Sequence, residues 1–309
     1  MRRPGLAWPA HEGVLAIDDE ALIGSRKADF TSIYDQADPR AYFQTLGDLD
    51  YQIPQQSLPV LQAVLAASQG EGDPREVLDI CCSYGINAAL LRCDVELAEI
   101  RARYTDPAFA ELSVEELIAA DAEFYSARRR NPDVAVLGLD IAESAIDYAC
   151  RAGLLTGGWA EDLEAVDPSP ILTVGVRDVG VIISTGGIGY VGERTFDRLL
   201  QVIESPSELW LAVFVLRALC YDDIANRLAG YGLVTEQVPD VTFRQRRFAD
   251  RDEYDAAIHD VEVRGLDPAG KEAEGWYHAE CYITRPAPAA AAAPLAELLA
   301  GALDEHNGH

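Results

Sequence analysis

The chain has 309 residues, of which 49% are hydrophobic, enough for one large α/β domain or for one domain with substantial insertions. Asp and Glu total 52 against 25 Lys and Arg, which gives an acidic protein with a formal net charge of -27. A field of this sign repels nucleic-acid phosphates and anionic membrane surfaces, so neither is expected as a partner, and high solubility is its simplest meaning.

The first 69 residues are predicted to form an arm and a cap in front of the main fold. Residues 1–25 carry scattered Pro and Gly without a period, so we expect a loosely docked arm. This arm has no continuous apolar segment of the kind that a signal peptide needs. Residues 29–56 are rich in aromatics and predict short helices and turns, and residues 58–67 predict a helix leading into the first strand.

Between residues 70 and 285, short apolar strands alternate with helices. Such strands, interleaved with helices, predict a Rossmann-like α/β fold with a mostly parallel sheet covered by helices on both faces. A closing strand pair is expected to complete a seven-stranded sheet. The predicted strands are 76–80, 134–139, one within 157–164, 179–184, 209–216, 233–238 and 277–284.

Three segments lie outside this alternation. Residues 94–131 are charged and mostly helical, with a capping box at Ser113 and Glu116, and predict an inserted lid or an oligomer contact such as a homodimer interface. Residues 239–276 offer material for a pocket cover. Residues 286–309 form an Ala/Pro-rich tail whose last part is either a docked helix or a solvated end.

The first stretch with chemical content is VLDICCSYGINAALL, in which Asp79 lies near the end of a strand and small residues lead to Gly85 and a helix. Ligands of open α/β sheets bind at the carboxyl ends of the strands, and small residues let the backbone approach them. Asp79 can accept a hydrogen bond from a cationic or hydroxyl-bearing ligand. The alternative is that it only caps the next helix.

The second stretch is VLGLDIAESAIDYA, in which Asp140 ends a buried strand and a helix begins a few residues later. An acidic residue at the tip of the second strand is how dinucleotide-binding folds hold the two hydroxyls of a ribose. A carboxylate offers two acceptor oxygens, which suit a diol.

These stretches resemble the motifs of class I S-adenosylmethionine-dependent methyltransferases. VLDICCSYG is similar to the family's first motif and GLDIAESAIDYA to its second-strand motif, with Asp140 at the ribose position. GGWAEDLE is similar to the third-strand motif at the adenine edge, and DVGVIISTGGIGYVGERTFDRLL to the fourth-strand motif below the active site. The resemblance implies these cofactor-binding residues: Asp79, Cys81, Ser83, Gly85, Asp140, Ile141, Glu161, Asp162, Ser184 and Thr185.

The resemblance runs in order through about residues 70–285 and implies an antiparallel final strand pair and S-adenosyl-L-methionine as the cofactor. It further implies O- or N-methylation of a small-molecule acceptor, with specialised metabolism as the setting. There are two departures. Cys81 and Ser83 occupy places where the family usually has glycine, which predicts a less open turn. Asp79 and Asp140 lie 61 residues apart, far beyond the roughly 20 residues of the dinucleotide fingerprint, and the insertion accounts for the gap.

Candidates for the acceptor side are aromatic or titratable residues outside the motifs. Tyr34, Tyr42 and Tyr51 are expected to shape an acceptor pocket, and Arg40 to pair with the methionine carboxylate, with a purely structural cap as the alternative. Tyr190 and His278 are the candidate catalytic residues, with packing roles as the alternative.

The six cysteines show no C-x-x-C spacing, so we expect reduced thiols, no metal site and a cytoplasmic protein. No apolar run is long enough to span a bilayer. Three alternative functions stay open: a peptide methyltransferase, a noncatalytic S-adenosylmethionine-binding or interaction protein, and a nicotinamide-dependent oxidoreductase. The absence of G-x-G-x-x-G argues against the last of these.

Overall fold

A computed structural model describes residue 33, residues 35–69 and residues 75–307, with side chains up to residue 303. The expectations for residues 1–25 and for Tyr34 lie outside these described residues. Within the described residues, no helix is both long enough and apolar enough to cross a membrane.

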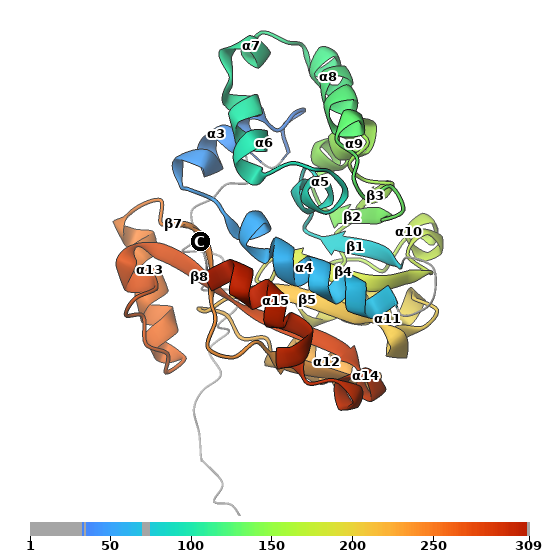
Figure 1. The fold of residues 1–309 in the computed structure, drawn as a ribbon, viewed down its shortest axis with the longest axis vertical. Helices are drawn as coiled ribbons and strands as arrows, with labels where there is room; N and C mark the ends of the chain where they lie inside the picture. The colour runs from blue at the N-terminus through green and yellow to red at the C-terminus, as the bar shows by residue number, and fades with distance from the viewer. Residues whose placement is uncertain (1–32, 34, 70–74, 308–309) are drawn as a thin grey trace, which may run out of the picture.

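One mixed sheet forms the centre of the fold (Figure 1). Along it run β3 (Gly157–Ala160), β2 (Val136–Asp140), β1 (Glu76–Ile80), β4 (Val179–Thr185), β5 (Trp210–Leu216), β8 (Trp276–Pro286) and β6 (Leu233–Gln237). The first five of these are parallel to one another, and β8 pairs antiparallel with both β5 and β6. The predicted Rossmann-like α/β class with an antiparallel finish is therefore confirmed.

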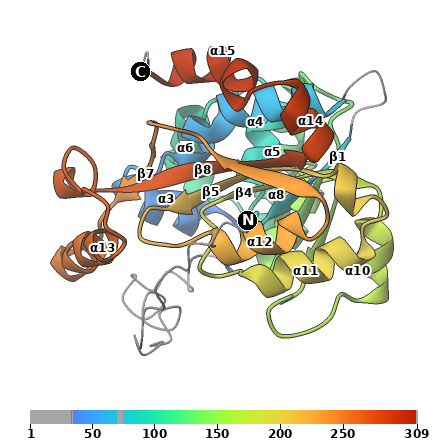
Figure 2. The ribbon, with the colours of Figure 1, turned by 90° about the horizontal axis from the view of Figure 1, so that it is seen from below.

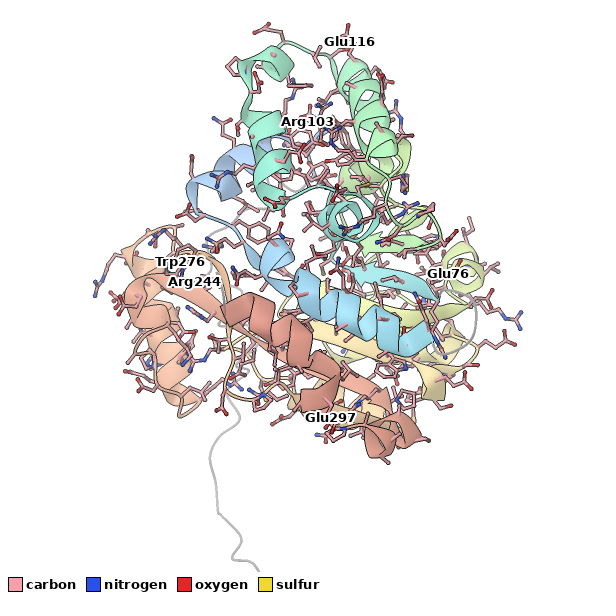
Figure 3. The ribbon with its side chains drawn as sticks, in the orientation of Figure 1. Glu76, Arg103, Glu116, Arg244, Trp276 and Glu297 are labelled. Atoms are coloured by element: carbon pink, nitrogen blue, oxygen red, sulfur yellow. The ribbon has the colours of Figure 1, made fainter. Side chains whose placement is uncertain are left out.

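The sheet has one strand more than the seven predicted, because β7 (Phe243–Arg247) pairs antiparallel with β8. Its sequence FRQRR has three arginines and does not look like a strand. Two of them, Arg244 and Arg247, place their guanidinium groups 5.1 and 4.3 Å from the centre of the Trp276 ring on β8. Such stacking lets long cationic side chains cover a sheet face, and it explains why residues 239–276 do not form only a loop. Figure 3 shows Arg244 and Trp276 side by side.

Helices cover both faces of the sheet (Figure 2). One face carries α4 (Ile53–Gln69), α5 (Ile86–Arg92), α9 (Glu143–Arg151) and α15 (Leu295–Asn307), and the other carries α10 (Pro170–Gly175), α11 (Glu193–Val202) and α12 (Asp222–Ala229). Successive strand residues point to opposite faces, so Val77 joins one core cluster and Leu78 the other, both fully buried. This double burial is why the central strands are mostly apolar, with polar residues mainly at their ends.

The insertion forms α6 (Leu97–Thr105), α7 (Pro107–Ala110) and α8 (Val114–Ala127), which project beyond the sheet in Figure 1. The capping box of Ser113 and Glu116 at the start of α8 is confirmed. Asp121 of α8 is fully buried and accepts from Arg103 Nε at 2.7 Å and from the hydroxyls of Tyr104 and Tyr148. Because Tyr148 belongs to α9, this carboxylate joins the insertion to the main fold. Figure 3 shows Arg103 between α6 and α8.

The remaining helices contact the insertion, the strands β7 and β8, and α4. The N-terminal α3 (Arg40–Asp48) packs on α6, and the short 3-10 turns are η1 (Pro206–Glu208) and η2 (Glu272–Glu274). Helix α13 (Arg251–Val263) follows β7 and is joined to it by a buried ion pair between Arg246 and Glu253. After β8, α14 (Ala287–Ala292) leads to α15, which packs on α4 through buried leucines.

Candidate functional site

The carboxyl ends of β1, β2 and β4 meet at one edge of the sheet. β1 lies between β2 and β4. From β1 the chain continues to β2 and β3 on one side and then returns to β4 and β5 on the other side, so this is the switch point of the sheet. In open α/β sheets, this edge is where ligands bind. The residues that end these strands, or directly follow them, therefore define the candidate site.

The turn after β1 has an unusual backbone. Cys81, Ser83 and Gly85 have φ values of 59°, 48° and 75°, all in the left-handed region that favours glycine. The N–H groups of Cys81 and Ser83 donate to the Leu139 carbonyl at 2.8 Å and to Asp140 Oδ2 at 2.8 Å. The two positions where glycine is usual in the resembled family thus keep a glycine-like conformation without being glycine. The presence of Cys81 and Ser83 in place of glycine therefore adds side chains to the turn but does not change its backbone path.

Ser83→Gly is expected to stabilise the protein by about 0.5–1 kcal/mol. Left-handed backbone costs a side-chain-bearing residue about 1–2 kcal/mol, and the greater freedom of unfolded glycine offsets about 0.4–1 kcal/mol of the gain. The Ser83 hydroxyl is buried with no hydrogen-bond partner in the part of the chain that the structure describes, so its loss adds no cost. Urea unfolding of Ser83→Gly beside Ser83→Ala measures the effect. Alanine also lacks the hydroxyl but keeps the strain, and an alanine variant as stable as the glycine variant would contradict the argument.

Asp79 lies on β1 one residue before the turn and is fully buried. The Asn87 amide donates to both Asp79 oxygens, at 3.1 and 3.2 Å, and also to Thr185 Oγ1 at 3.0 Å. Burial raises the pKa of Asp79 to about 8, the hydrogen bond from Asn87 lowers it, and the nearby Asp140 raises it further. At neutral pH this carboxyl is therefore largely protonated, and a cation placed beside it would favour its ionised form.

Asp140 ends β2 and is half-buried. Its Oδ2 accepts from Ser83 N at 2.8 Å and its Oδ1 from Ala142 N at 3.0 Å. Burial raises its pKa, while these backbone bonds lower it. A carboxylate has about four acceptor positions, and the Ile141 backbone N–H also interacts with this one, so a position remains for a ligand hydroxyl. Ile141, which follows, exposes 72% of its surface and presents an apolar face beside this carboxylate.

The two acidic residues after β3 have different surroundings. Glu161 accepts from the backbone N of Ser169 at 2.9 Å and from its hydroxyl at 2.6 Å, next to the start of α10. Asp162 is exposed, and its bonds from Glu164 N and Ala165 N at 2.9 and 3.2 Å both go to Oδ1. The Glu161 carboxylate is therefore occupied by Ser169, and Asp162 is the better placed of the two to bind a ligand.

The end of β4 presses against the turn of β1. Ser184 is fully buried and donates to the Ile80 carbonyl at 3.1 Å, while Thr185 meets Asn87. A Cβ on Gly187 would lie 2.6 Å from Ser184 Oγ and 2.9 Å from Cys81 Sγ, so only glycine allows this approach. Ser184 thus joins two strands, whereas Thr185 belongs to the polar group around Asp79.

The N-terminal cap reaches the same edge. Tyr84, within the turn, accepts from Gln36 N at 3.1 Å and donates to the Gln36 carbonyl at 2.9 Å, which docks the cap on the turn. The rings of Tyr42 and Tyr51 lie 6.2 Å apart. Burial raises the pKa of Tyr51 to about 12, the hydrogen bond to Tyr42 lowers it, and the nearby Asp79 raises it. The structure therefore places Tyr42 beside Tyr51, in the cap that docks on this edge.

Arg40 is not presented to this edge. Its Nε and Nη2 donate to the Asp38 carboxylate at 2.9 and 2.7 Å. Its Nη1 donates to the carbonyls of Phe109, Ala110 and Leu112 at 3.0 Å each. These bonds engage every arm of the guanidinium and join the cap to the insertion, so a contact with a ligand carboxylate would require breaking them.

The two candidate catalytic residues have different surroundings. Tyr190 follows β4, exposes 57% of its surface and raises the pKa of Tyr51, so it belongs to the same edge. His278 of β8 is 7% exposed, and its Nδ1 lies 2.9 Å from the Thr242 hydroxyl, which matches the packing alternative more than a catalytic one. Among the residues described, no three His, Cys, Asp or Glu side chains are grouped to hold a metal ion.

Two polar residues of this edge were not found from the sequence. Asn87 is 5% exposed, and its only signal is a polar residue in the first turn of the apolar helix INAALLR. Gln245 is 4% exposed and lies on β7, the strand that the sequence did not reveal.

No family model and no curated protein matches the sequence. The chain is similar to the structure of magnesium protoporphyrin IX methyltransferase from Synechocystis PCC 6803 with bound SAM, at 12% identity and a TM-score of 0.39, over 88% of this chain and 100% of that one. It is also similar to the plantazolicin methyltransferase BpumL in complex with SAH, at 10% identity and a TM-score of 0.42, over 87% and 98%. A SAM-dependent methyltransferase from Aquifex aeolicus is similar at 14% identity and a TM-score of 0.39, over 84% and 100%. Likenesses at this level carry no conclusion about chemistry, which rests on the geometry above.

Proposed function

We propose that the protein is a methyltransferase that uses S-adenosyl-L-methionine. The observation that carries the proposal is the joining of Asp140 to the left-handed turn 81–85 through Ser83 N. This contact places a carboxylate that can still accept from a ligand beside a turn that a ligand can approach closely, at the switch point of the sheet.

The residues present fit the parts of this cofactor. Asp140 would take the ribose hydroxyls, the exposed Ile141 would cover a face of the adenine, and Asp162 would meet the adenine edge. The buried Asp79 suits the cationic methionine end, because a cation restores the ionised form that burial disfavours. Ser83 adds a buried hydroxyl with no partner in the described part of the chain. Cys81 and Gly85 contribute through the backbone of the turn, and Glu161, Ser184 and Thr185 as supports for this edge.

When bound, the cofactor supplies a methyl group that its sulfonium has already activated, so the protein mainly has to align the acceptor with that methyl group. The aromatic residues Tyr42, Tyr51 and Tyr190 lie on the acceptor side of this edge, and the insertion and the β7–α13 segment extend from the sheet around it. We propose a small-molecule acceptor methylated at oxygen or nitrogen, and a cytoplasmic protein, as the sequence predicts.

Thermal unfolding with S-adenosylhomocysteine tests the cofactor. At about 100 times its dissociation constant, a ligand that binds only the folded state adds about 2.7 kcal/mol, which for a chain of this size corresponds to a shift of about 4 °C. NADH and NADPH at the same concentration are expected to cause no shift. A shift with either dinucleotide and none with S-adenosylhomocysteine would support the oxidoreductase alternative instead.

A further inference from the structure

Gln245 is held rigidly at the centre of β7. Its backbone carbonyl accepts from Gln52 N at 2.7 Å, and Arg247 N donates to the Leu49 carbonyl at 2.7 Å. The cap segment 49–52 thus bonds to one edge of β7 while β8 pairs with the other. The hydrogen bond from Gln52 N fixes the Gln245 backbone on the side of the cap, while the register with β8 shifts between Arg244 and Arg247.

The Gln245 amide lies against the loop that follows β4. A Cβ added to Gly186 would lie 2.4 Å from Gln245 Nε2, so the amide occupies the space beside this glycine. Gly186 comes directly after Thr185, the last residue of β4, at the carboxyl edge of the sheet. Gln245 therefore borders the same edge as Asp79 and Thr185, and approaches it from the side opposite to Asp140, because β4 and β2 flank β1.

Gln245 exposes only 4% of its surface. Its amide oxygen is buried and has no hydrogen-bond partner in the described part of the chain. Buried side-chain acceptors are nearly always paired, so each exception requires an explanation. A strand that needed only packing here would be served by Leu or Met. An acceptor kept in reserve for a bound ligand explains both the residue type and its missing partner.

The charges around Gln245 select the kind of ligand group. The neighbouring Arg246 is paired through both of its terminal nitrogens with Glu253, at 2.9 and 2.6 Å, so its charge is balanced within the fold. The Asp79 carboxyl belongs to the same edge. A ligand carboxylate would therefore meet an acceptor oxygen and an acidic group, whereas a neutral or cationic group with an O–H or N–H would find a partner.

From this geometry we infer that Gln245 binds the methyl acceptor, and that the acceptor presents a hydroxyl or amine to the Gln245 amide oxygen rather than a carboxylate. The inference rests on the proposed methyl transfer and assigns to Gln245 the acceptor side of the site. Tyr51 and Tyr190, which both lie at this edge, offer ring surface for a flat acceptor.

Binding of small aromatic probes to the protein saturated with S-adenosylhomocysteine tests this inference. Ligand-observed NMR would compare phenol with anisole and aniline with N,N-dimethylaniline, and would include benzoate. One hydrogen bond corresponds to a preference of roughly 5- to 10-fold for phenol and aniline over their methylated partners, with benzoate the weakest. Gln245→Met keeps the length of the side chain and is expected to reduce this preference to less than about 2-fold. Gln237→Met, at an exposed glutamine of β6, is expected to keep it.

S-adenosylhomocysteine affinity separates the failure of this inference from failure of the proposed function. Wild type that does not bind S-adenosylhomocysteine contradicts the proposed function itself. If Gln245→Met binds S-adenosylhomocysteine like wild type and keeps the preference, the acceptor role is wrong. If Gln245→Met unfolds at the wild-type midpoint but binds S-adenosylhomocysteine more than about 10-fold more weakly, the amide binds the cofactor, and the acceptor role is again wrong. Equal binding of all probes by wild type, or tightest binding of benzoate, would also contradict the acceptor role. Gln245→Leu serves in place of Gln245→Met if the latter does not fold.

Discussion

Replacing Asp140 with alanine is expected to weaken S-adenosylhomocysteine binding by roughly 10-fold to several hundred-fold. Hydrogen bonds to a charged group contribute about 1.5–3 kcal/mol each, and water partly replaces the two that a ribose would lose. The same substitution is expected to lower the free energy of unfolding by about 0.5–2 kcal/mol, because Ser83 N and Ala142 N lose their acceptor. Titration calorimetry and urea unfolding on one variant measure both effects.

The matched control is Glu143→Ala, three residues further on. Glu143 is exposed in the first turn of α9, and its loss changes the net charge by the same amount. It is expected to leave S-adenosylhomocysteine affinity within about 2-fold of wild type, since exposed charges interact weakly. Unchanged affinity in a folded Asp140→Ala variant would remove Asp140 from the site and leave it only the task of holding the turn.

The sheet could be predicted from the sequence because its central strands are buried on both faces. Val77 and Leu78 are both fully buried in opposite core clusters, so β1 appears as a short apolar strand interrupted by Asp79. The closing strand pair was also predicted, and its antiparallel pairing followed from the resemblance to the methyltransferase family. β7 was missed, because its stability comes from arginines stacked on Trp276 and from backbone bonds to the distant cap segment 49–52. Neither leaves a local hydrophobic pattern.

The site was predictable only in part, for a similar reason. Asp79 and Asp140 lie at the carboxyl ends of recognisable strands, and the sheet topology alone puts them at one edge. Whether a polar side chain is paired within the protein or remains available to a ligand depends on partners that are distant in the sequence. The Arg40 guanidinium is taken up by carbonyls of residues 109–112, some 70 positions away, and Gln245 meets Gly186 across two strands that are not neighbours in the sequence. Such pairings have no signature in a single segment of sequence.

Asp79→Asn is expected to change how stability depends on pH. The folded pKa of about 8 lies above the value of 3.8 for an unperturbed aspartate, so the folded protein holds this proton more tightly than the unfolded chain. The stability that this carboxyl contributes is complete below about pH 4, falls as the pH rises, and is lost above about pH 8. About four pKa units at 1.36 kcal/mol each set an upper bound of about 5 kcal/mol for the loss.

An asparagine side chain resembles the protonated acid, with one oxygen left to accept from Asn87, and it does not titrate. Asp79→Asn is therefore expected to exceed wild type in stability by about 1–2 kcal/mol near pH 5 and by several kcal/mol at pH 9, within the upper bound of about 5 kcal/mol. The exposed Asp133, just before β2, provides the control variant Asp133→Asn, which is expected to follow the wild-type curve at both pH values. Urea unfolding at the two pH values gives the comparison.

The same carboxyl links pH to cofactor binding with the opposite preference. A cationic methionine end favours ionised Asp79, so wild-type affinity for S-adenosylmethionine is expected to rise with pH up to about 8 and then level off, with a proton released on binding below that pH. Asp79→Asn is expected to bind with no such rise and to be at least about 10-fold weaker than wild type at pH 9, because it cannot carry the charge. Calorimetry in two buffers of different ionisation enthalpy detects the released proton directly. A variant that gains stability at pH 9 yet keeps wild-type affinity and proton release would show that Asp79 is a buried acid of the fold and that the cation is held elsewhere.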